Sequence, residues 1–498
     1  METNQKNPTH NFSVAEFKKA QDAMVQKNTH STSNSMGWQQ YGRKTKNYSR
    51  KEVQEILDRG TEITKRDLSR SYFYKDGFYR RILIYYATLL KYTGLLIPNL
   101  KPQVPNGFSD KQIARYDAAL DFVEQANFPT LLTNFSLRAL IDGAYYGAIV
   151  NLDKNNLTVL DLPADFCRTR FKDLYGKDII EFNLQYFDKL VDDGTRSSAL
   201  ASYPEDIAKA YRKWHKGKRS TSWVIIPSEI GVCFSPFDEV SPLFLSTILA
   251  SLDYDEAVNT EKRRDQEEIK KIIVQKIPHN SDNQLLFEPD EAVEIHAGTV
   301  GMMKNNEFVD VLTTYADVDV VTSKTTSDNA TSSLEKMTTN IYNEAGASQQ
   351  LFGADSSMSI ELSIDNDTAM MMALFGDKYS IFITEIVNRL FGKGNISFKY
   401  KILPITYYNA EKYTDSTFKV ASSGYSYLLP ALGCGLSQRD LTSIKDLEND
   451  VLKLDQRLRP LQSAFTQSTG SSDEGGRPSI DNKDKNPSTI QKDESLNG

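Results

Sequence analysis

Apolar side chains begin to recur at helical spacing only after a polar start. Residues 1–48 are rich in Asn, Gln, Ser, Thr and Lys and hold few large apolar groups, so we expect this arm to be mobile or to dock on a neighbour. The apolar spacing then predicts helices over 49–70 and 77–93. A loop punctuated by prolines is expected over 98–105.

The next part of the chain mixes helical and strand patterns. Two more helices are expected within 109–147. Short apolar runs separated by polar turns predict strands at 148–150, 157–160, 179–184 and 223–226, with a helix over 204–216 before the last of them. The combination predicts an α+β body.

A long helix is predicted over 242–271, and its character changes midway. The first half carries an apolar stripe suited to a core, made of Phe244, Leu245, Ile248, Leu249, Leu252 and Val258. Residues 261–268 hold no apolar side chain, and a lone helix without an apolar stripe is marginal in water. This half is either a solvated face with intrahelical ion pairs or a surface that packs against copies of itself in a ring.

A small β-rich excursion is predicted after this helix. Strand-like runs occur at 272–277, 292–297, 308–312 and 318–321, and turns at 278–280 and 304–306 separate them. A helix over 328–344 then brings the chain back. A helix out, a β module and a helix back predict a stalk that carries a head.

A second long helix is predicted in the last third of the chain. Residues 358–364 alternate with period two, which predicts a strand, and Asp365 is placed to cap a helix over 366–391. Gly392 is the expected C-cap, and Gly376 is a candidate kink.

An amphipathic helix over 437–460 and a polar low-complexity tail over 467–498 complete the predicted elements.

The composition is that of an ordinary soluble protein. A length of 498 residues predicts about three domains. Hydrophobic content of 39%, charged content of 25% and a mean hydropathy of −0.47 exclude collagen, coiled-coil and membrane classes. A net charge of −7 excludes a polycation that coats nucleic acid, so any such contact is expected to be local or weak.

The cysteines and the apolar segments bear on where the protein is found. Cys167, Cys233 and Cys434 are scattered, which fits neither a disulfide framework nor a CxxC site and predicts assembly in a reducing cytosol. The polar N-terminus does not have the pattern of a secretory signal. The most apolar segment, 82–90, is much shorter than the roughly 20 residues that a bilayer requires, so no membrane contact is expected.

A search for catalytic and cofactor motifs is mostly negative. The Gly-Lys pairs lack the upstream glycine of a Walker loop, and none of the five histidines is spaced as in HExxH. Residues 433–435 (GCG) lack the third glycine of a dinucleotide turn and are interpreted as a loop. No catalytic residue, no cofactor and no metal ion is therefore assigned.

Two kinds of charged cluster leave alternatives open. Asp317 with Asp319, and Asp253 with Asp255, could bind a divalent cation, although solvated acidic side chains are the simpler interpretation. The basic run 212–219, which contains a tryptophan, could meet phosphates. The simpler interpretation is that these cations lie at the end of a helix, where the macrodipole favours positive charge.

Four stretches occur along the chain in a characteristic order: 78–83 (FYRRIL) leading to 95–98 (LLIP), 138–147 (RALIDGAYYG) followed by 160–163 (LDLP), 343–353 (NEAGASQQLFG), and 431–436 (ALGCGL). In this order they resemble the tailed-bacteriophage portal family over about residues 72–461. None is a catalytic signature, and their order around the helix, β module and helix excursion carries the resemblance. Many relatives have proline after the glycine that matches Gly346, where this chain has Ala347.

The resemblance implies a multidomain portal fold. Its parts would be a flexible N-terminal arm (1–48), a wing (49–241, completed by 393–406), a stem helix (242–271), a small clip (272–325), a second stem helix (326–345), a tunnel-loop region (346–365), a spine helix (366–392), a helical crown (407–465) and a disordered tail (466–498).

The resemblance also implies site residues. Basic rings along the DNA channel would come from Lys262, Arg263, Arg264, Lys270 and Lys271, although salt bridges between subunits fit the same residues. Residues facing DNA at the tunnel loop would be Gln349, Gln350, Asp355, Ser356 and Ser357. Clip residues that meet terminase or adaptor, or are simply solvent-exposed, would be His279, His296, Lys304 and Asn305.

The function implied by the resemblance is a non-enzymatic channel for packaging and ejecting double-stranded DNA. Portal rings, typically of twelve subunits, assemble in the host cytoplasm with major capsid and scaffolding proteins and occupy one capsid vertex of the virion. They dock the large subunit of terminase and later the head-to-tail adaptor. A net-acidic chain fits, because an attractive polycationic wall would hold DNA that must slide. The alternatives are another head or collar protein, or an α/β hydrolase or nuclease.

Overall fold

The computed structural model describes residues 46–100, 107–174, 176–190, 193–269, 271–276, 289–303, 309–314, 328–347, 351 and 358–454. Most of the predicted arm and the whole tail over 466–498 lie outside the described residues. The chain divides into two compact units, Met1–Leu441 and Thr442–Gly498. Helices and strands occur together, which confirms the α+β class.

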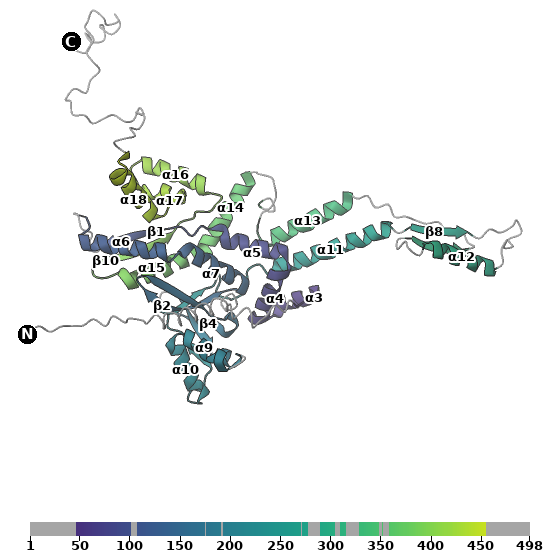
Figure 1. Cartoon of the computed structure of the whole chain (residues 1–498), viewed down its shortest axis with the longest axis horizontal. Coiled ribbons are helices and arrows are strands. Elements are labelled where there is room, and N and C mark those ends of the chain that lie inside the picture. The colour runs from purple at the N-terminus through teal and green to yellow at the C-terminus, as the bar shows by residue number, and fades with distance from the viewer. Residues whose placement is uncertain are drawn as a thin grey trace, which may run out of the picture. The chain divides into compact units, whose positions relative to one another are not determined.

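The described part of the first unit begins with helices α3 (Arg50–Arg59), α4 (Glu62–Lys75), α5 (Gly77–Leu89), α6 (Asp110–Gln125) and α7 (Phe128–Asp142) (Figure 1). A single helix over 49–70 is wrong, because Gly60 is extended and Thr61 caps α4 by accepting the N–H of Thr64. Gly143 ends α7 with φ +81. The backbone of Ser241 lies 2.7 Å from where a Cβ would stand, so the position requires glycine.

Two antiparallel sheets follow α7. The first has the order β3–β2–β7, with β2 (Tyr145–Asp153), β3 (Asn156–Asp161) and β7 (Gly231–Phe234). The second has the order β4–β5–β6, with β4 (Cys167–Lys172), β5 (Asp178–Asn183) and β6 (Trp223–Ile225). Tyr145 lies opposite Phe234, and Cys167 lies opposite Phe182. The strands predicted within 148–226 are confirmed, whereas β4 and β7 are additional.

A second core covers the β4–β5–β6 sheet. Its helices are α8 (Gln185–Asp188), α9 (Asp193–Ser202) and α10 (Glu205–His215), and the 3-10 turn Ala164–Phe166 precedes β4. Phe182, Phe187 and Tyr211 are buried there. The helix predicted over 204–216 is confirmed as α10, whereas α9 was not predicted.

The third pairing joins distant parts of the chain. β1 (Gly94–Leu100) runs antiparallel to β10 (Ile396–Ile402), with Gly94 opposite Ile402. The prediction of a loop beginning at Pro98 is therefore wrong. Proline is tolerated at this position because β1 is an edge strand, paired on one side only in this two-stranded sheet.

The excursion contains α11 (Ser246–Ile269), β8 (Lys271–Lys276), α12 (Pro289–Met303), β9 (Val309–Thr314) and α13 (Asp328–Glu344) (Figure 1). β8 and β9 are parallel, as expected for strands joined by a crossover helix. The strand predicted at 292–297 is wrong, because Pro289 and two acidic residues open a helix there. The strand predicted at 318–321 lies outside the described residues.

A continuous helical segment runs from Met358 to Phe391. It consists of α14 (Met358–Met371), a π-helical turn (Met372–Gly376) and α15 (Asp377–Phe391). The strand predicted over 358–364 is wrong, because the buried stripe of Ile364, Thr368, Met371 and Phe375 already begins in this run. Asp365 is not a cap; its carboxylate accepts a 2.8 Å bond from Lys412. The kink expected at Gly376 corresponds to the π-helical turn.

The C-terminal helices are α16 (Ala410–Ser422), α17 (Leu428–Gly433) and α18 (Gln438–Asp446), followed by the π-helical turn Leu447–Val451. α18 begins in the first unit and ends in the second. A single helix over 437–460 is wrong, because the helical conformation is interrupted at Lys453, whose φ is +50. In the second unit, Lys445 donates to Glu448 at 2.7 Å.

Aromatic side chains fill the centre of the main core. Phe135 stacks on Tyr145 with ring centroids 4.0 Å apart, and Phe234 packs edge-on against Tyr379 at 4.6 Å. These rings join α7, β2, β7 and α15 into one body. Across the described ranges, no helix combines the length and apolar character needed to cross a membrane.

Candidate functional site at the root of α11 and α13

Helices α11 and α13 pack against each other (Figure 1). Ile248 on α11 and Ile341 on α13 are fully buried at the body end of this pair. Further along α11, Lys262, Arg263 and Arg264 are exposed, and none of them forms an ion pair with another described residue. The apolar and polar halves predicted for this helix are therefore both present.

Aromatic side chains hold the body end of the pair. Tyr86 stacks on Phe244 with ring centroids 4.7 Å apart and an interplanar angle of 15°. Phe78 packs edge-on against Tyr254 of α11 at 5.3 Å and Tyr342 of α13 at 6.1 Å. Helix α5 therefore contacts both helices through rings, which restricts their movement at this end.

An exposed ion pair adds a polar contact on α11. The Arg50 guanidinium of α3 lies 2.5 Å from the Asp253 carboxylate. Asp255, two residues on, has its pKa raised by burial and by the nearby Asp76 carboxylate. The two acidic residues of α11 thus have different surroundings and do not converge on one point.

Asp367 of α14 is the centre of a polar network at the body end of α11 and α13. Its Oδ2 accepts a 2.9 Å bond from the Tyr85 hydroxyl, and its Oδ1 accepts a 3.3 Å bond from the Tyr86 hydroxyl. Tyr86 also lies 3.2 Å from the carbonyl of Ala345, which follows α13. Burial raises the pKa of Asp367, and the two tyrosine hydroxyls oppose that shift. Asp367 and Tyr86 together thereby connect α5, α14 and the end of α13.

The start of the predicted tunnel-loop region is anchored at this point. Ala345 and Ala347 are buried, and Gly346 between them adopts φ +69, a conformation that favours glycine. The chain thus leaves α13 through a fixed turn. Asp367 lies just beyond the other end of the region.

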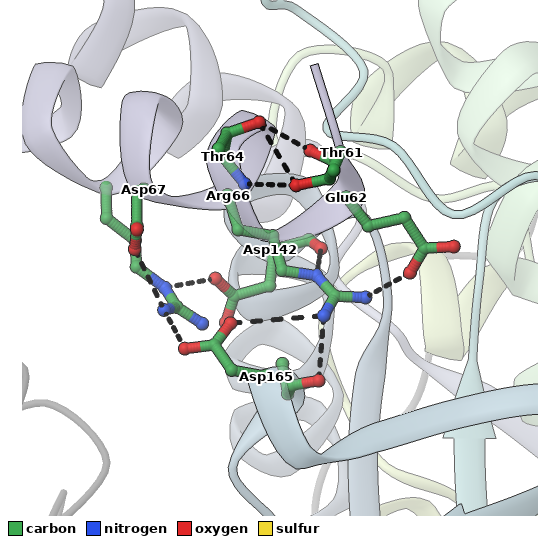
Figure 2. Close-up of polar contacts among 9 residues, drawn as sticks. Thr61, Glu62, Thr64, Arg66, Asp67, Asp142 and Asp165 are labelled. Carbon is green, nitrogen blue, oxygen red and sulfur yellow. Dashed lines mark hydrogen bonds and ion pairs between the residues drawn. The ribbon is translucent and has the colours of Figure 1, made fainter.

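A second polar network, shown in Figure 2, is centred on Arg66 of α4. This fully buried side chain donates to the carbonyl of Asp142 at 3.0 Å and to the carbonyl of Ala164 at 2.7 Å. It also pairs with Glu62 at 3.2 Å. The α4 helix is thereby tied to the end of α7 and to the turn before β4.

Arg70, one turn along α4, completes the network. Its guanidinium bonds the Asp142 and Asp165 carboxylates, each at 2.7 Å. These carboxylates raise the pKa of Arg70 against the effect of its burial. Both carboxylates are paired with guanidinium groups from α4, so the network is suited to holding elements together.

The structure describes only part of the predicted site. Lys262, Arg263 and Arg264 lie together on α11, Lys271 begins β8, and His296 is half-buried on α12. The remaining predicted site residues lie outside the described residues: Lys270, His279, Lys304, Asn305, Gln349, Gln350, Asp355, Ser356 and Ser357.

The other sequence candidates give no catalytic arrangement. Asp317 and Asp319 lie outside the described residues. In the ranges that the structure covers, no three His, Cys, Asp or Glu side chains are grouped to hold a metal ion. Gly433 ends α17 and Gly435 turns with φ +90, as expected for a loop.

The Asp367 and Arg66 networks were not predicted. Tyr85 and Asp367 are 282 positions apart in the sequence, and both tyrosines lie in a segment, 77–93, that is predicted only to be helical. A signal does exist in the chain, because an Asp on the apolar stripe that also carries Ile364 and Met371 needs polar partners when buried. The sequence does not identify which hydroxyls supply them.

No protein-family model matches the chain, and no curated protein matches it. Among solved structures, the chain is similar to a chain of the virion of the native gene transfer agent particle, with 11% identity and a TM-score of 0.37 over 75% of this chain and 93% of that one. It is also similar to a chain of the neck of that particle, computed with C12 symmetry, with 12% identity and a TM-score of 0.38 over 74% and 92%.

Proposed function

We propose that this chain is the subunit of a phage portal ring, a non-enzymatic channel for double-stranded DNA. The observation that supports the proposal is the excursion formed by α11, β8, α12, β9 and α13. Its outgoing and returning helices both pack against Phe78 of α5. Such an excursion places a small unit at the end of two helices. In a ring of copies, these small units would together surround a central channel.

The excursion has surface that one copy leaves uncovered. On α12, Val293 is 66% exposed, Ile295 is 49% exposed and Val300 is 43% exposed. The parallel pair of β8 and β9 is a two-stranded sheet, and isolated two-stranded sheets are at best marginally stable in water. Contacts with neighbouring copies of the same module would bury this apolar surface.

The parts of the portal fold follow from this proposal. The body up to residue 241, completed by β10, is the wing; α11 and α13 are the stem; and β8, α12 and β9 form the clip. Residues 346–365 are the tunnel-loop region, although their last part is already helical in α14. α15 belongs to the spine, and α16 to α18 belong to the crown.

The proposed site residues have separate roles. The exposed cations Lys262, Arg263 and Arg264, with Lys270 and Lys271 beyond them, contact DNA phosphates passing the stem. The constriction is lined by Gln349, Gln350, Asp355, Ser356 and Ser357. The clip offers His279, His296, Lys304 and Asn305 to the large subunit of terminase and then to the head-to-tail adaptor. The ring occupies one vertex of the virion, beside the major capsid protein.

Negative-stain electron microscopy and mass photometry of the full-length chain test the proposal. We expect rings with a central hole and a mass near twelve times 56.3 kDa. A chain that stays monomeric at high concentration, or assembles without a central hole, would contradict it.

A further inference from the structure

A patch of cations at the end of α10 has no described ion-pair partner. Arg212, Lys213 and Lys216 are exposed, as is Lys218 in the following turn, and none forms an ion pair with a described residue. We call these four residues the α10 patch. Lys209, one turn earlier on the same helix, instead pairs with Glu205 at 2.9 Å.

The fold presents the four charges on one small surface. α10 buries Ile207 and Tyr211 against the second core, which leaves the patch positions on its outer side. Gly217 then turns the chain with φ +66, and the N–H of Lys218 donates to the carbonyl of Lys213 at 2.9 Å. This turn places Lys218 beside the end of the helix.

The four cations of the α10 patch repel one another, and no described carboxylate forms an ion pair that would offset this repulsion. Arg212 and Lys216 are four positions apart on a helix, where like charges repel. The helix macrodipole favours cations in the last turn, but its effect is screened and extends over that turn only. Elsewhere on this body, Arg168 and Arg170 both reach the Glu181 carboxylate at 2.7 Å. The α10 patch lacks such a carboxylate among the described residues.

We propose that the α10 patch docks an acidic segment of a partner protein, with its carboxylates at helical spacing. Charge complementarity is the argument: cations at 212, 213 and 216 match carboxylates three or four positions apart on a facing helix. The surface is separate from α11, so the inference stands whether or not the chain forms a channel.

The aromatic groups in the patch favour protein over nucleic acid as the partner. Trp214 is half-buried and packs on Tyr211 at 6.1 Å, and His215 stacks on the same ring at 5.6 Å. Tyr211 thus covers part of the Trp214 ring and one face of the exposed His215 ring, which leaves little aromatic surface for stacking on unpaired bases. Arg212 to Lys216 also span only about 6 Å at helical rise, and Lys218 turns back beside them, which is short for the many phosphate contacts of a duplex-binding surface.

Fluorescence anisotropy on the full-length chain tests the inference with three probes. These are a labelled helical peptide with Glu at positions i, i+3, i+4 and i+7, the same peptide with Lys for Glu, and a 30-base-pair duplex. The variants are Arg212→Glu with Lys216→Glu, and a control, Lys111→Glu with Lys154→Glu, which makes the same charge change at exposed lysines elsewhere. Circular dichroism establishes that each variant is folded.

We expect the acidic peptide to bind the wild-type chain and the control alike, and to bind the patch variant at least about tenfold more weakly. The patch variant should instead gain binding of the Lys peptide, a gain that loss of folding could not produce. Equal losses in both variants, or no binding of the acidic peptide, would overturn the inference. Tighter binding of the duplex through the same residues would overturn it in favour of nucleic acid.

Discussion

The side-chain amide of Gln438 occupies the outer edge of strand β1 at Leu96. Gln438 Oε1 accepts the Leu96 N–H at 3.1 Å, and Nε2 donates to the Leu96 carbonyl at 3.3 Å. Nε2 also donates to the Tyr116 hydroxyl at 2.5 Å. A residue of α18 thus makes the two bonds that a neighbouring strand would make, and it covers an edge that could otherwise pair with another chain.

Gln438→Ala should open this edge. The buried Leu96 N–H and carbonyl would lose their partners, at a cost of about 1–3 kcal/mol of stability. Hydrogen exchange of the β1 amides, read by mass spectrometry, should accelerate at Leu96. Gln54→Ala, which removes an exposed bond to Asp58, should leave β1 exchange unchanged. Unchanged exchange in Gln438→Ala would show that Leu96 has another partner.

Arg66→Ala should destabilise the body strongly. The substitution leaves two buried carbonyls and a carboxylate network without their central cation, and breaking a buried pair in this way costs about 3–5 kcal/mol. Thermal unfolding followed by circular dichroism should show a clearly lowered midpoint. Arg59→Ala, at an exposed position at the end of α3, is the control and should change the midpoint little. Equal midpoints for the two variants would contradict a structural role for Arg66.

Asp367 should make the protein less stable as pH rises. Its pKa is raised in the folded state, so the folded protein binds more protons than the unfolded chain between the ordinary carboxyl pKa and the raised one. Stability from this group is therefore present at the acid end of that window and is lost toward the alkaline end. Asp67 and Asp255 contribute in the same direction.

Asp367→Asn isolates this contribution. The variant should lose stability at acid pH, where the neutral carboxyl is replaced by an amide, and its deficit should shrink as pH rises. Urea unfolding at several pH values measures the difference. Asp365→Asn, which removes the exposed partner of Lys412 on the same helix, serves as the control. A deficit for Asp367→Asn that grows with pH would contradict the assigned shift.

The proposed ring should depend on the apolar face of α12. Val293→Glu combined with Val300→Glu introduces charge where neighbouring copies would meet, so mass photometry should show a shift from rings to smaller species. The conservative pair Val293→Ile and Val300→Ile should keep the rings. Ring formation by the glutamate variant would place the contact between copies elsewhere.

The stem cations distinguish two roles. Replacing Lys262, Arg263 and Arg264 by alanine should preserve the ring mass and weaken duplex DNA binding, with a smaller dependence of affinity on salt. Loss of rings with unchanged DNA affinity would instead assign these residues to salt bridges between subunits. The Lys111→Ala, Lys154→Ala and Lys51→Ala triple variant, which removes three exposed cations elsewhere, is the matched control.

Local hydrophobic patterns predicted the elements whose buried face is determined by the residues of the element itself. The helices α5, α7, α10 and α13 lie within predicted helical ranges, and α13 has the predicted bounds. The errors arise where a short alternating run is part of a helix. Residues 358–364 and 292–297 both alternate, but Ile364 continues the stripe of α14 and Pro289 opens α12, and these longer patterns prevail.

The site was less predictable, because its contacts cross the sequence. The exposure of Lys262 and its neighbours follows from a helix segment without apolar residues. The bonds from Tyr85 and Tyr86 to Asp367, and from Arg66 to Asp142 and Ala164, depend on which helices the fold brings together. A single sequence contains no periodicity that encodes such partners.

The π-helical turn at Met372–Gly376 sets the angular relation between the two ends of the long helix. A π turn contains one residue more than the α turn it replaces, and each residue of an α-helix rotates the next by about 100°. Asp367, Met371, Phe375 and Tyr379, spaced four residues apart across this turn, are therefore all buried, although an uninterrupted α-helix would drift by about 40° at each such step. Deleting one residue here would rotate the buried face of α15 by about 100° relative to that of α14. The number of residues between the two helices is therefore fixed.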